Sequence, residues 1–267
     1  MNDRVSVAMD NGIADVRLNR PAKMNALDPA MFEALAAAGS KLKEQAGLRA
    51  VVLSGEGRAF CAGLDMESFA RIADGGQNSR KLTERTHGVA NWAQNVVWQW
   101  RELPVPVIAA VHGVAFGGGF QLMLGADMRY VAPGTRLSVM EIKWGLVPDM
   151  AGTQLMRHLA REDIVRELTY TGRVFAAEEA LAFGFATRLV ENPHAAALAI
   201  AGEIAAKSPD AVRAAKRLLN AAPLSDAGTG LIAEAAEQEK LLASRNQIEA
   251  VRANIEQRQP RFAHARG

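Results

Sequence analysis

The sequence has little that would commit the chain to a special environment. Cys61 is the only cysteine among 267 residues, which excludes an internal disulfide framework and is typical of a reducing compartment. No apolar run approaches the roughly 20 residues that a membrane-spanning helix needs. The first ten residues also lack the charged-then-apolar pattern of a secretory signal. We therefore expect a cytoplasmic protein with no membrane partner.

The chain also lacks an excess of either charge. Lysine and arginine number 31 against 29 acidic residues, which gives a net charge of +2, and no basic block or aromatic-interleaved stripe stands out. Nucleic acid is therefore not an expected partner. The five histidines do not stand at metal-ligand spacing with acidic or cysteine partners, so no metal site is expected.

Hydrophobic residues make up 49% of the chain, which is ordinary for a globular protein with an ample core. Residues 5–9 and 13–18 alternate in polarity around an Asp-Asn-Gly turn, which predicts a hairpin. Asp28 and Pro29 predict the start of a helix, and residues 50–53 predict a short buried strand.

Further elements alternate along the chain in the same manner. The pattern predicts helices at 89–103, 151–161 and 176–183, strands at 129–132 and 186–190, and a mobile loop at 74–79. Alternating strands and helices predict an α/β fold with parallel strands and right-handed crossovers. In such folds, ligands bind at loops that follow the carboxyl ends of strands.

The composition changes after about Asn192, where helix formers dominate up to Arg258. We interpret residues 1–195 as the core with the active site and residues 196–267 as a helical region for packing or oligomerisation. Its apolar faces need a partner, either the body of the same chain or another subunit.

Residues 107–130 hold the most informative pattern. A short apolar run precedes Gly117, Gly118 and Gly119, and good helix formers follow them. A glycine turn before a helix start leaves backbone N–H groups open to an anion, or to an oxygen that becomes anionic during a reaction. The alternative is that the glycines only allow close helix–strand packing. Residues 54–65 form a second glycine-rich loop directly after a strand, so the two loops could converge on one site.

Several motifs together resemble the crotonase superfamily, the enoyl-CoA hydratase/isomerase fold. They are LNRP and NAL within 18–27, GRAFCAGLD at 57–65, AVHG, GGG and GAD within 110–127, GLVP and GTQ within 145–154, and TGR and AEEA within 171–180. The resemblance implies a crotonase-like spiral of ββα units whose C-terminal helical region builds trimers or dimers of trimers. It also implies acyl-CoA thioester substrates, with the backbone N–H groups of Leu64 and Gly118 as an oxyanion hole for the thioester oxygen.

The resemblance also points to the acid and base groups. Hydratases of this family carry two glutamates; the second matches Glu141, but the first position here is Gln121, an amide that does not transfer protons at neutral pH. The family's dienoyl-CoA isomerases instead carry a glutamate and an aspartate with the separation of Glu141 and Asp149, although they have an aspartate where this chain has Gln121. Asp149 precedes an expected helix and could be only its N-cap. Gln121 could keep a lesser role, by orienting a water molecule or by hydrogen bonding to a carboxyl group.

CoA binding by resemblance falls on Ala22, Lys23, Met24 and Arg58, with Ala62 and Asp65 nearby. Lys23 and Arg58 would meet the nucleotide phosphates, or they could be solvated surface charges. No cofactor is expected, because CoA is part of the substrate. Cys61 lies in the oxyanion loop without a basic partner in sequence and is expected to be a small buried side chain.

The leading hypothesis is an acyl-CoA enzyme that shifts a double bond by proton transfer through a thioester enolate. The first alternative is an enoyl-CoA hydratase in which Asp149 replaces the missing glutamate. The second alternative is a catalytically silent acyl-CoA-binding member of the family.

Overall fold

A computed structural model describes residues 4–73 and 81–265 of the chain. The expected loop at residues 74–79 lies outside these ranges. The strands are β1 Val5–Asp10, β2 Ile13–Leu18, β3 Ala50–Gly55, β4 Val107–Val111, β5 Val114–Phe116, β6 Met128–Val131, β7 Arg136–Ser138, β8 Phe175–Ala176 and β9 Arg188–Leu189. The α-helices are α1 Pro29–Lys43, α2 Met66–Ala73, α3 Trp92–Glu102, α4 Gly118–Leu124, α5 Gly152–Met156, α6 Glu162–Thr171, α7 Ala177–Phe183, α8 Pro193–Ala205, α9 Pro209–Ala221, α10 Ala227–Leu241 and α11 Arg245–Ile255. The described residues also form the 3-10 turns η1 Pro21–Lys23, η2 Glu141–Trp144 and η3 Ala222–Leu224.

The strands form two sheets, and the chain alternates between them. A six-stranded sheet has the order β1-β2-β3-β4-β6-β9, and a three-stranded sheet has the order β5-β7-β8. Only the β1–β2 pair of the larger sheet is antiparallel, and its other pairs are parallel. In the middle of the chain, β4 of the larger sheet is followed by β5 of the smaller sheet and α4, and β6 is followed by β7 and then α5, while β3 is followed by the bridge of Cys61 to Ala115 and then α2. This arrangement confirms the α/β class and the predicted spiral of ββα units.

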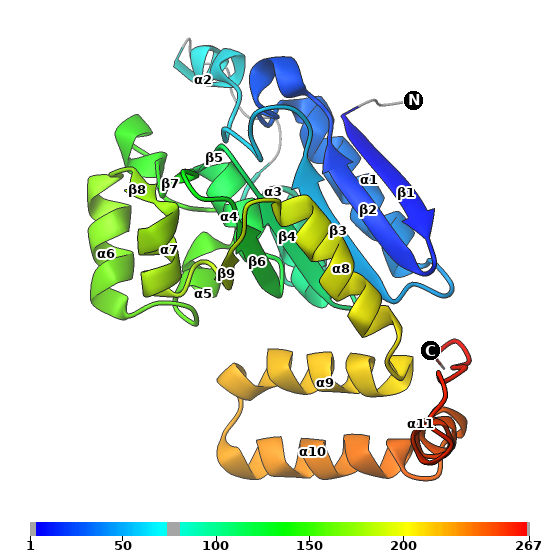
Figure 1. Cartoon of the computed structure of the whole chain (residues 1–267). Coiled ribbons are helices and arrows are strands. Elements are labelled where there is room, and N and C mark those ends of the chain that lie inside the picture. Colours follow the sequence, from blue (N-terminus) through cyan, green and yellow to red (C-terminus); the bar gives the residue numbers. More distant parts are fainter. Residues whose placement is uncertain (1–3, 74–80, 266–267) are drawn as a thin grey trace.

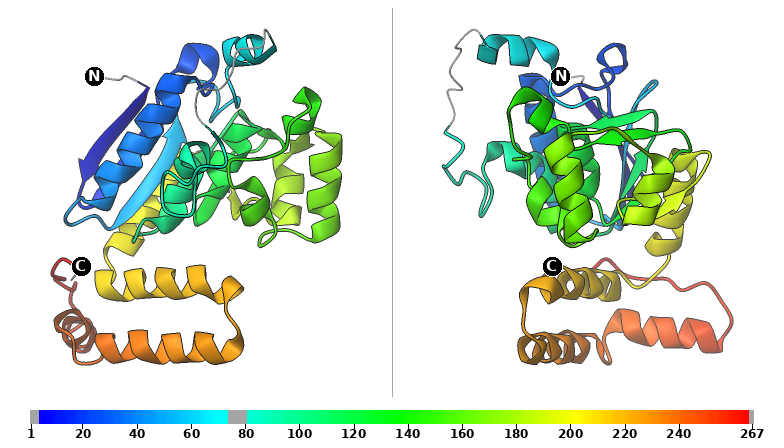
Figure 2. Two further views of the ribbon diagram at one scale, coloured as in Figure 1. Left: turned by 180° about the vertical axis from the view of Figure 1, so that it is seen from behind. Right: turned by 90° about the vertical axis from the view of Figure 1, so that its left-hand side faces the viewer.

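The larger sheet is covered on both faces (Figures 1 and 2). Successive residues of β3 therefore pack on opposite faces of the sheet. Val51 and Leu53 belong to the main core with α1 and α3, whereas Ala50 and Val52 pack with Ala197 of α8. Side chains of a strand point alternately to opposite faces. A strand that is buried on both faces reads as a continuous apolar run, which is what residues 50–53 show.

The start of the chain folds locally as its sequence predicts. Asp10-Asn11-Gly12 closes the hairpin, with Asn11 and Gly12 both at positive φ. Asp28 accepts a hydrogen bond from the Met31 amide at 2.8 Å and caps α1, whose first residue is Pro29.

Two helix predictions need correction. Val89 is not helical, because the Asn91 side chain accepts from the amides of Ala93 and Gln94 and starts α3 at Trp92. The helix predicted at 151–161 ends at Met156. Two of the next bonds, from His158 N to Leu155 O and from Leu159 N to Met156 O, have three-residue spacing, and a new helix then begins with acidic residues in its first turn.

The C-terminal helices divide into two groups. The helix α8 packs against the larger sheet, so the expected boundary between residues 195 and 196 falls inside this helix. Helices α9, α10 and α11 extend beyond the body (Figure 1). Among the described residues, no helix is both long and apolar enough to cross a bilayer.

Lys216 fastens α9 to the body of the protein. Its side chain is 6% exposed, and its Nζ donates to Trp100 O, Val105 O and the Asp127 carboxylate at 2.8–3.1 Å. Asp127 also accepts from the Val107 amide at the start of β4. Burial lowers the pKa of Lys216, and the Asp127 charge opposes that effect.

We expect Lys216→Met to lower the free energy of unfolding by about 1–3 kcal/mol, because two buried carbonyls and a carboxylate lose their donor while the apolar stem is kept. Urea denaturation measures this change. The exposed Lys207 between α8 and α9 provides the control variant Lys207→Met. Equal stability of the two variants would contradict the assignment.

Candidate active site

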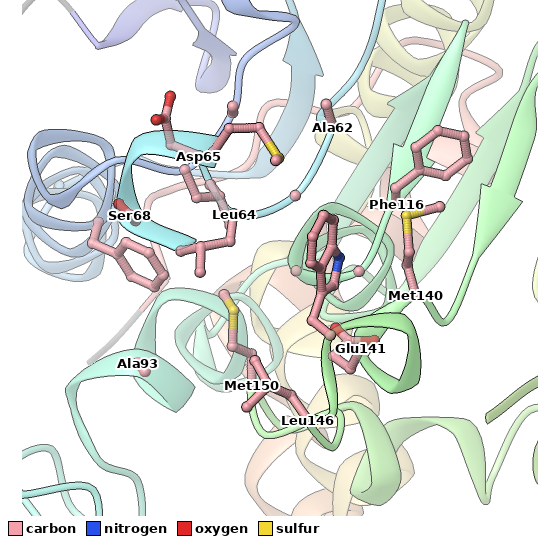
Figure 3. Close-up of a pocket in the computed structure, with 18 of the residues that line it drawn as sticks. Ala62, Leu64, Asp65, Ser68, Ala93, Phe116, Met140, Glu141, Leu146 and Met150 are labelled. Carbon is pink, nitrogen blue, oxygen red and sulfur yellow. The ribbon is translucent and has the colours of Figure 1, made fainter. Parts of the chain in front are cut away.

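A cavity of about 910 Å³ lies where the two glycine-rich loops meet. Segments far apart in sequence line it: residues 22–33, 62–68, 82–93, 116–118 and 140–150. Figure 3 shows side chains from these segments around one space, with Leu64 on one side and Glu141 and Met150 on another. Its wall is mostly apolar and includes four methionines, at positions 24, 66, 140 and 150.

The two loops are joined by a short parallel ladder. Cys61 bridges to Ala115, with Phe116 N donating to Cys61 O at 3.1 Å. A Cβ at Gly119 would lie 2.3 Å from Cys61 O, and a Cβ at Gly63 would lie 2.6 Å from Phe116 O. Both positions therefore need glycine because the two main chains approach each other closely.

The two amides predicted to form the oxyanion hole lie in these adjoining loops. Gly118 is the first residue of α4, where an N–H has no intrahelical partner. Leu27 N donates to Gly63 O and Asp65 N donates to Leu27 O, so the neighbours of Leu64 are paired but its own amide is not used. Within the described residues neither the Leu64 nor the Gly118 amide donates to a protein acceptor.

The short distance between the two loops supports a common role for the Leu64 and Gly118 amides as an oxyanion hole. The Cβ position at Gly63, one residue before Leu64, would lie 3.7 Å from Gly118 N. Two preplaced donors around one oxygen would stabilise a developing enolate, and removing one such donor typically costs about 2.7–4 kcal/mol. The oxyanion role of Leu64 and Gly118 stays a prediction that this geometry permits.

Among the described residues, Glu141 has a side-chain hydrogen-bond partner, Gln121, at only one of its two carboxylate oxygens. Gln121 is 1% exposed, and its Nε2 donates to Glu141 Oε1 at 2.6 Å. Its own Oε1 accepts from the amides of Met150 and Gly152 at 2.8 and 2.9 Å. Glu141 Oε2 is buried without a hydrogen-bond partner among the described residues. Gln121 therefore orients the carboxylate, and it is not itself among the residues that line the cavity.

Asp149 lines the same cavity, and the structure contradicts the alternative that it caps a helix. The N-cap of α5 is Ala151, at φ 68°, and no side chain caps this helix. Burial raises the pKa of Asp149. Burial also raises the pKa of Glu141, and the nearby Asp149 charge raises it further, against the hydrogen bond from Gln121. Glu141 and Asp149 thus line one cavity, and the Asp149 charge acts on the Glu141 carboxyl.

The variant Gln121→Glu should make activity sensitive to rising pH. The introduced carboxyl would sit beside Glu141, and two carboxyls at this distance cannot both ionise without a strong rise in one pKa. At low pH the introduced carboxyl is protonated and can still donate to Glu141. As pH rises through the raised pKa, a second charge enters and activity falls, as does stability. A pH–rate profile that follows the wild type up to pH 9 would contradict this expectation.

The residues expected to bind CoA are only partly brought together. Ala22, Lys23, Met24, Ala62 and Asp65 line the cavity. The Asp65 carboxylate, however, is buried against Arg20 and so is not a free group for a ligand. Lys23 is half exposed, with its Nζ 3.7 Å from Glu67.

Arg58 is exposed and is not among the residues that line the cavity. The CoA-binding role of this residue, like that of the group above, stays a prediction.

Cys61 is fully buried, and its Sγ donates to Asn25 O at 3.2 Å. Burial raises the pKa of its thiol to about 12, so it stays neutral at physiological pH. The described part of the chain contains no group of three or more His, Cys, Asp or Glu side chains able to hold a metal ion.

The sequence analysis assigned no function to Arg20 or Asn25. Asn25 is fully buried at positive φ, and its Nδ2 reaches carbonyl oxygens of Glu56, Ala59 and Phe60 in the oxyanion loop. Arg20 donates to the Asp65 carboxylate and to Ala26 O. Both lie within the LNRP and NAL motifs, which were the available signal, but only the tertiary structure shows what these residues contact.

Residues 8–265 match the family described as Enoyl-CoA hydratase/isomerase. The human mitochondrial Delta(3,5)-Delta(2,4)-dienoyl-CoA isomerase is 34% identical over 76% of this chain and 64% of its own length. The chain thus spans less than two thirds of that relative. A probable enoyl-CoA hydratase of Bacillus subtilis is 29% identical over 97% of this chain and 98% of its own.

Solved structures show the same fold over nearly the whole chain. A putative enoyl-CoA hydratase from Streptomyces coelicolor superposes with a TM-score of 0.89 at 31% identity, covering 97% of this chain and 94% of that one. An enoyl-CoA hydratase from Bacillus anthracis gives a TM-score of 0.87 at 32% identity, covering 97% and 98%. Hydratases and isomerases thus both stand among the similar proteins.

Proposed function

Because this chain belongs to the enoyl-CoA hydratase/isomerase family, we propose that it is an acyl-CoA enzyme that moves a double bond by proton transfer through a thioester enolate. The observation that carries this proposal is the pair of carboxyl groups, Glu141 and Asp149, at one cavity with Gln121 bound to the first of them. A hydratase of the usual kind would have a glutamate in place of Gln121.

The proposed reaction needs no water. In a 3,5-dienoyl thioester, one carboxylate takes a proton from C2, and the electrons move into a dienolate whose negative charge rests on the thioester oxygen. The amides of Leu64 and Gly118 would donate to that oxygen. Protonation at C6 by the second carboxyl group then gives the 2,4-dienoyl thioester, so substrate and product are isomers.

We assign the C2 proton to Glu141. A Cβ at Gly117 would lie 3.3 Å from Glu141 Oε1, which puts this carboxylate beside the residue that precedes Gly118. C2 is bonded to the carbonyl carbon, so a base next to the oxyanion hole is suitably placed for it. Asp149 then remains for the far end of the conjugated system. Similarity to dienoyl-CoA isomerases over 76% of the chain supports the type of reaction.

A hydratase is the second candidate. Its support is similarity to a probable enoyl-CoA hydratase over 97% of the chain. In this reading Asp149 and Glu141 share the tasks of activating water and delivering the α-proton.

Absorbance assays on the purified protein distinguish these functions. A 3,5-dienoyl-CoA should give a new band of the conjugated 2,4-dienoyl product, whereas loss of the enoyl band from a 2-enoyl-CoA with formation of a hydroxyacyl product supports the hydratase. If neither substrate changes but both bind, the protein is a silent acyl-CoA binder and the proposal is wrong.

The pH dependence offers a further prediction for Glu141. As a base it must be deprotonated, so kcat/KM should rise with pH through its pKa, which burial holds above the ordinary value of 4.5. Asp149 donates the C6 proton in its protonated form, whereas in its ionised form its charge raises the pKa of Glu141, and Asp149→Asn removes that charge. Its residual activity should therefore rise at lower pH than that of the wild type. If kcat/KM rises at the same pH in the wild type and in Asp149→Asn, the expected effect of Asp149 on the pKa of Glu141 is contradicted.

We also propose that α9, α10 and α11 pack against other copies of the chain as a trimer or a dimer of trimers. Leu219, Leu231, Ile232 and Ile255 on these helices are 64–78% exposed, an apolar surface that a partner would cover. Sedimentation of the purified protein tests the assembly. We also propose that the protein is cytoplasmic.

A further inference from the structure

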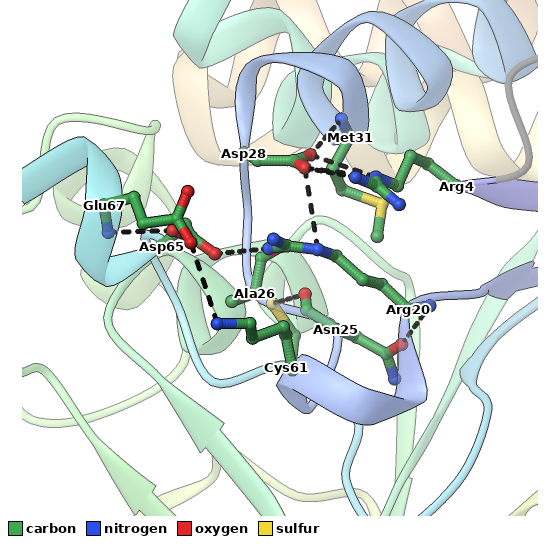
Figure 4. A network of polar contacts seen from close by, with 10 residues as sticks. Arg4, Arg20, Asn25, Ala26, Asp28, Met31, Cys61, Asp65 and Glu67 are labelled. Atoms are coloured by element: carbon green, nitrogen blue, oxygen red, sulfur yellow. Dashed lines mark hydrogen bonds and ion pairs between the residues drawn. The ribbon is translucent and has the colours of Figure 1, made fainter.

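Arg20 is a largely buried arginine that the proposed reaction does not use. Its side chain is 13% exposed. Its Nη1 donates to the Asp65 carboxylate and, at 3.2 Å, to Ala26 O, and its Nε lies 3.6 Å from Asp28 Oδ2. Figure 4 shows Arg20 between Asp28 and Asp65.

Two of the groups that Arg20 contacts, Asp65 and Ala26, adjoin the residues that pair on either side of Leu64. Asp65 directly follows Leu64 in the chain. Ala26 directly precedes Leu27, whose N–H and C=O bond to Gly63 and Asp65. The guanidinium therefore links the loop that carries Leu64 to the segment against which that loop is paired.

The Asp65 carboxylate is fixed at both of its oxygens. Oδ1 accepts from Glu67 N at 2.9 Å, at the start of α2, while Oδ2 accepts from Arg20. Burial alone would raise the pKa of Asp65, but the Arg20 and Glu67 hydrogen bonds outweigh it and the pKa is lowered. Without Arg20, a carboxylate with 5% exposure would lose its only cation at hydrogen-bond distance among the described residues, and the loop would have to move to hydrate it.

We infer that Arg20 is a positioning residue that holds the Leu64 amide at the place of the thioester oxygen. This inference rests on the proposed function of that amide. Arg20 does not touch the reacting atoms; it acts through Asp65 and Ala26. A displacement of about 1 Å in such a donor can cost on the order of 10²-fold in rate.

The chain supplies a matched control in Arg4. Its Nη2 pairs with the same Asp28 carboxylate at 2.7 Å, and no bond from it to Asp65 is present in the described structure. Arg4→Gln removes a cation from the same network but leaves the Asp65 contact intact. Arg20→Gln removes both a cation of this network and the contact with Asp65. Arg20→Lys keeps a charge that can pair with Asp65 but cannot also reach Ala26 in the same geometry.

Two readouts test the inference. Arg20→Gln should lower kcat on the order of 10- to 100-fold with little change in KM, Arg20→Lys should recover part of the loss, and Arg4→Gln should leave kcat unchanged. The second readout needs no turnover: infrared difference spectra of bound, ¹³C-labelled butyryl-CoA should show a lowered carbonyl stretch in the wild type and in Arg4→Gln, and a smaller lowering in Arg20→Gln.

Each outcome decides the question. Full carbonyl lowering and unchanged kcat in Arg20→Gln, or equal losses in Arg4→Gln, would overturn the inference. If Arg20→Gln does not fold, Asp65→Asn replaces it and should reduce the carbonyl lowering to a similar degree; an undiminished lowering there overturns the inference. A lowered stretch in a wild-type protein that turns over neither substrate would refute the proposed reaction and retain the role of Arg20. No lowering in the wild type would overturn both.

Discussion

Glu141→Gln is expected to reduce turnover by roughly 10²–10⁴-fold while thioester binding stays close to that of the wild type. The amide keeps the size of the side chain and can still accept the hydrogen bond from Gln121 Nε2, now 2.6 Å from Glu141 Oε1. What it loses is the carboxylate oxygen Oε2, which has no hydrogen-bond partner among the described residues, and with it the capacity to take a proton. The variant therefore separates chemistry from folding and binding.

Steady-state kinetics and calorimetric binding of a saturated acyl-CoA measure the two effects separately. Glu67→Gln is a suitable control, since Glu67 lies on α2 beside the cavity-lining Met66 and Ser68 and carries no proposed catalytic role. It should leave kcat unchanged. Wild-type turnover in the Glu141 variant would remove the role assigned to this carboxylate.

Gly63→Ala is expected to reduce kcat by roughly 10²–10³-fold, which is the effect of losing one oxyanion donor. The new methyl would lie 2.6 Å from Phe116 O and 3.7 Å from Gly118 N, at a φ of +89°. The loop of Leu64 and the turn of Gly118 would then have to separate. Both donors would shift, although neither is itself replaced. The same strain should lower the free energy of unfolding by about 1–3 kcal/mol.

A second glycine separates the steric effect from backbone strain. Gly134 has a φ of +74°, but its Cβ position has no heavy atom of the described part of the chain, other than its own neighbours, within 4 Å. Gly134→Ala should therefore cost only the conformational penalty, about 1–2 kcal/mol, and leave kcat unchanged. Equal losses of kcat in the two variants would show that the Gly63 effect is not local to the oxyanion loops.

The sequence predicted most of the elements that carry the site, because their signals are local. The hairpin follows from Asp10-Asn11-Gly12, and the start of α1 follows from Asp28 and Pro29. The helix expected after Ala151 was predicted too long, because spacing of apolar residues does not reveal where hydrogen bonds change from four-residue to three-residue spacing. The N-cap alternative for Asp149 was wrong for a related reason: the sequence does not show at which residue the helix begins.

Residue identity alone determined which groups this protein can use. It has glycines where two main chains nearly touch, a glutamate and an aspartate with suitable spacing, and an amide in place of a second glutamate. Only the tertiary structure decided how they are coupled: Gln121 bonds to Glu141, Arg20 bonds to Asp65, and the Gly63 and Gly118 loops adjoin. Such contacts join residues that stand 20 to 55 positions apart, and the packing of the two sheets, which no local pattern encodes, brings them within hydrogen-bond distance.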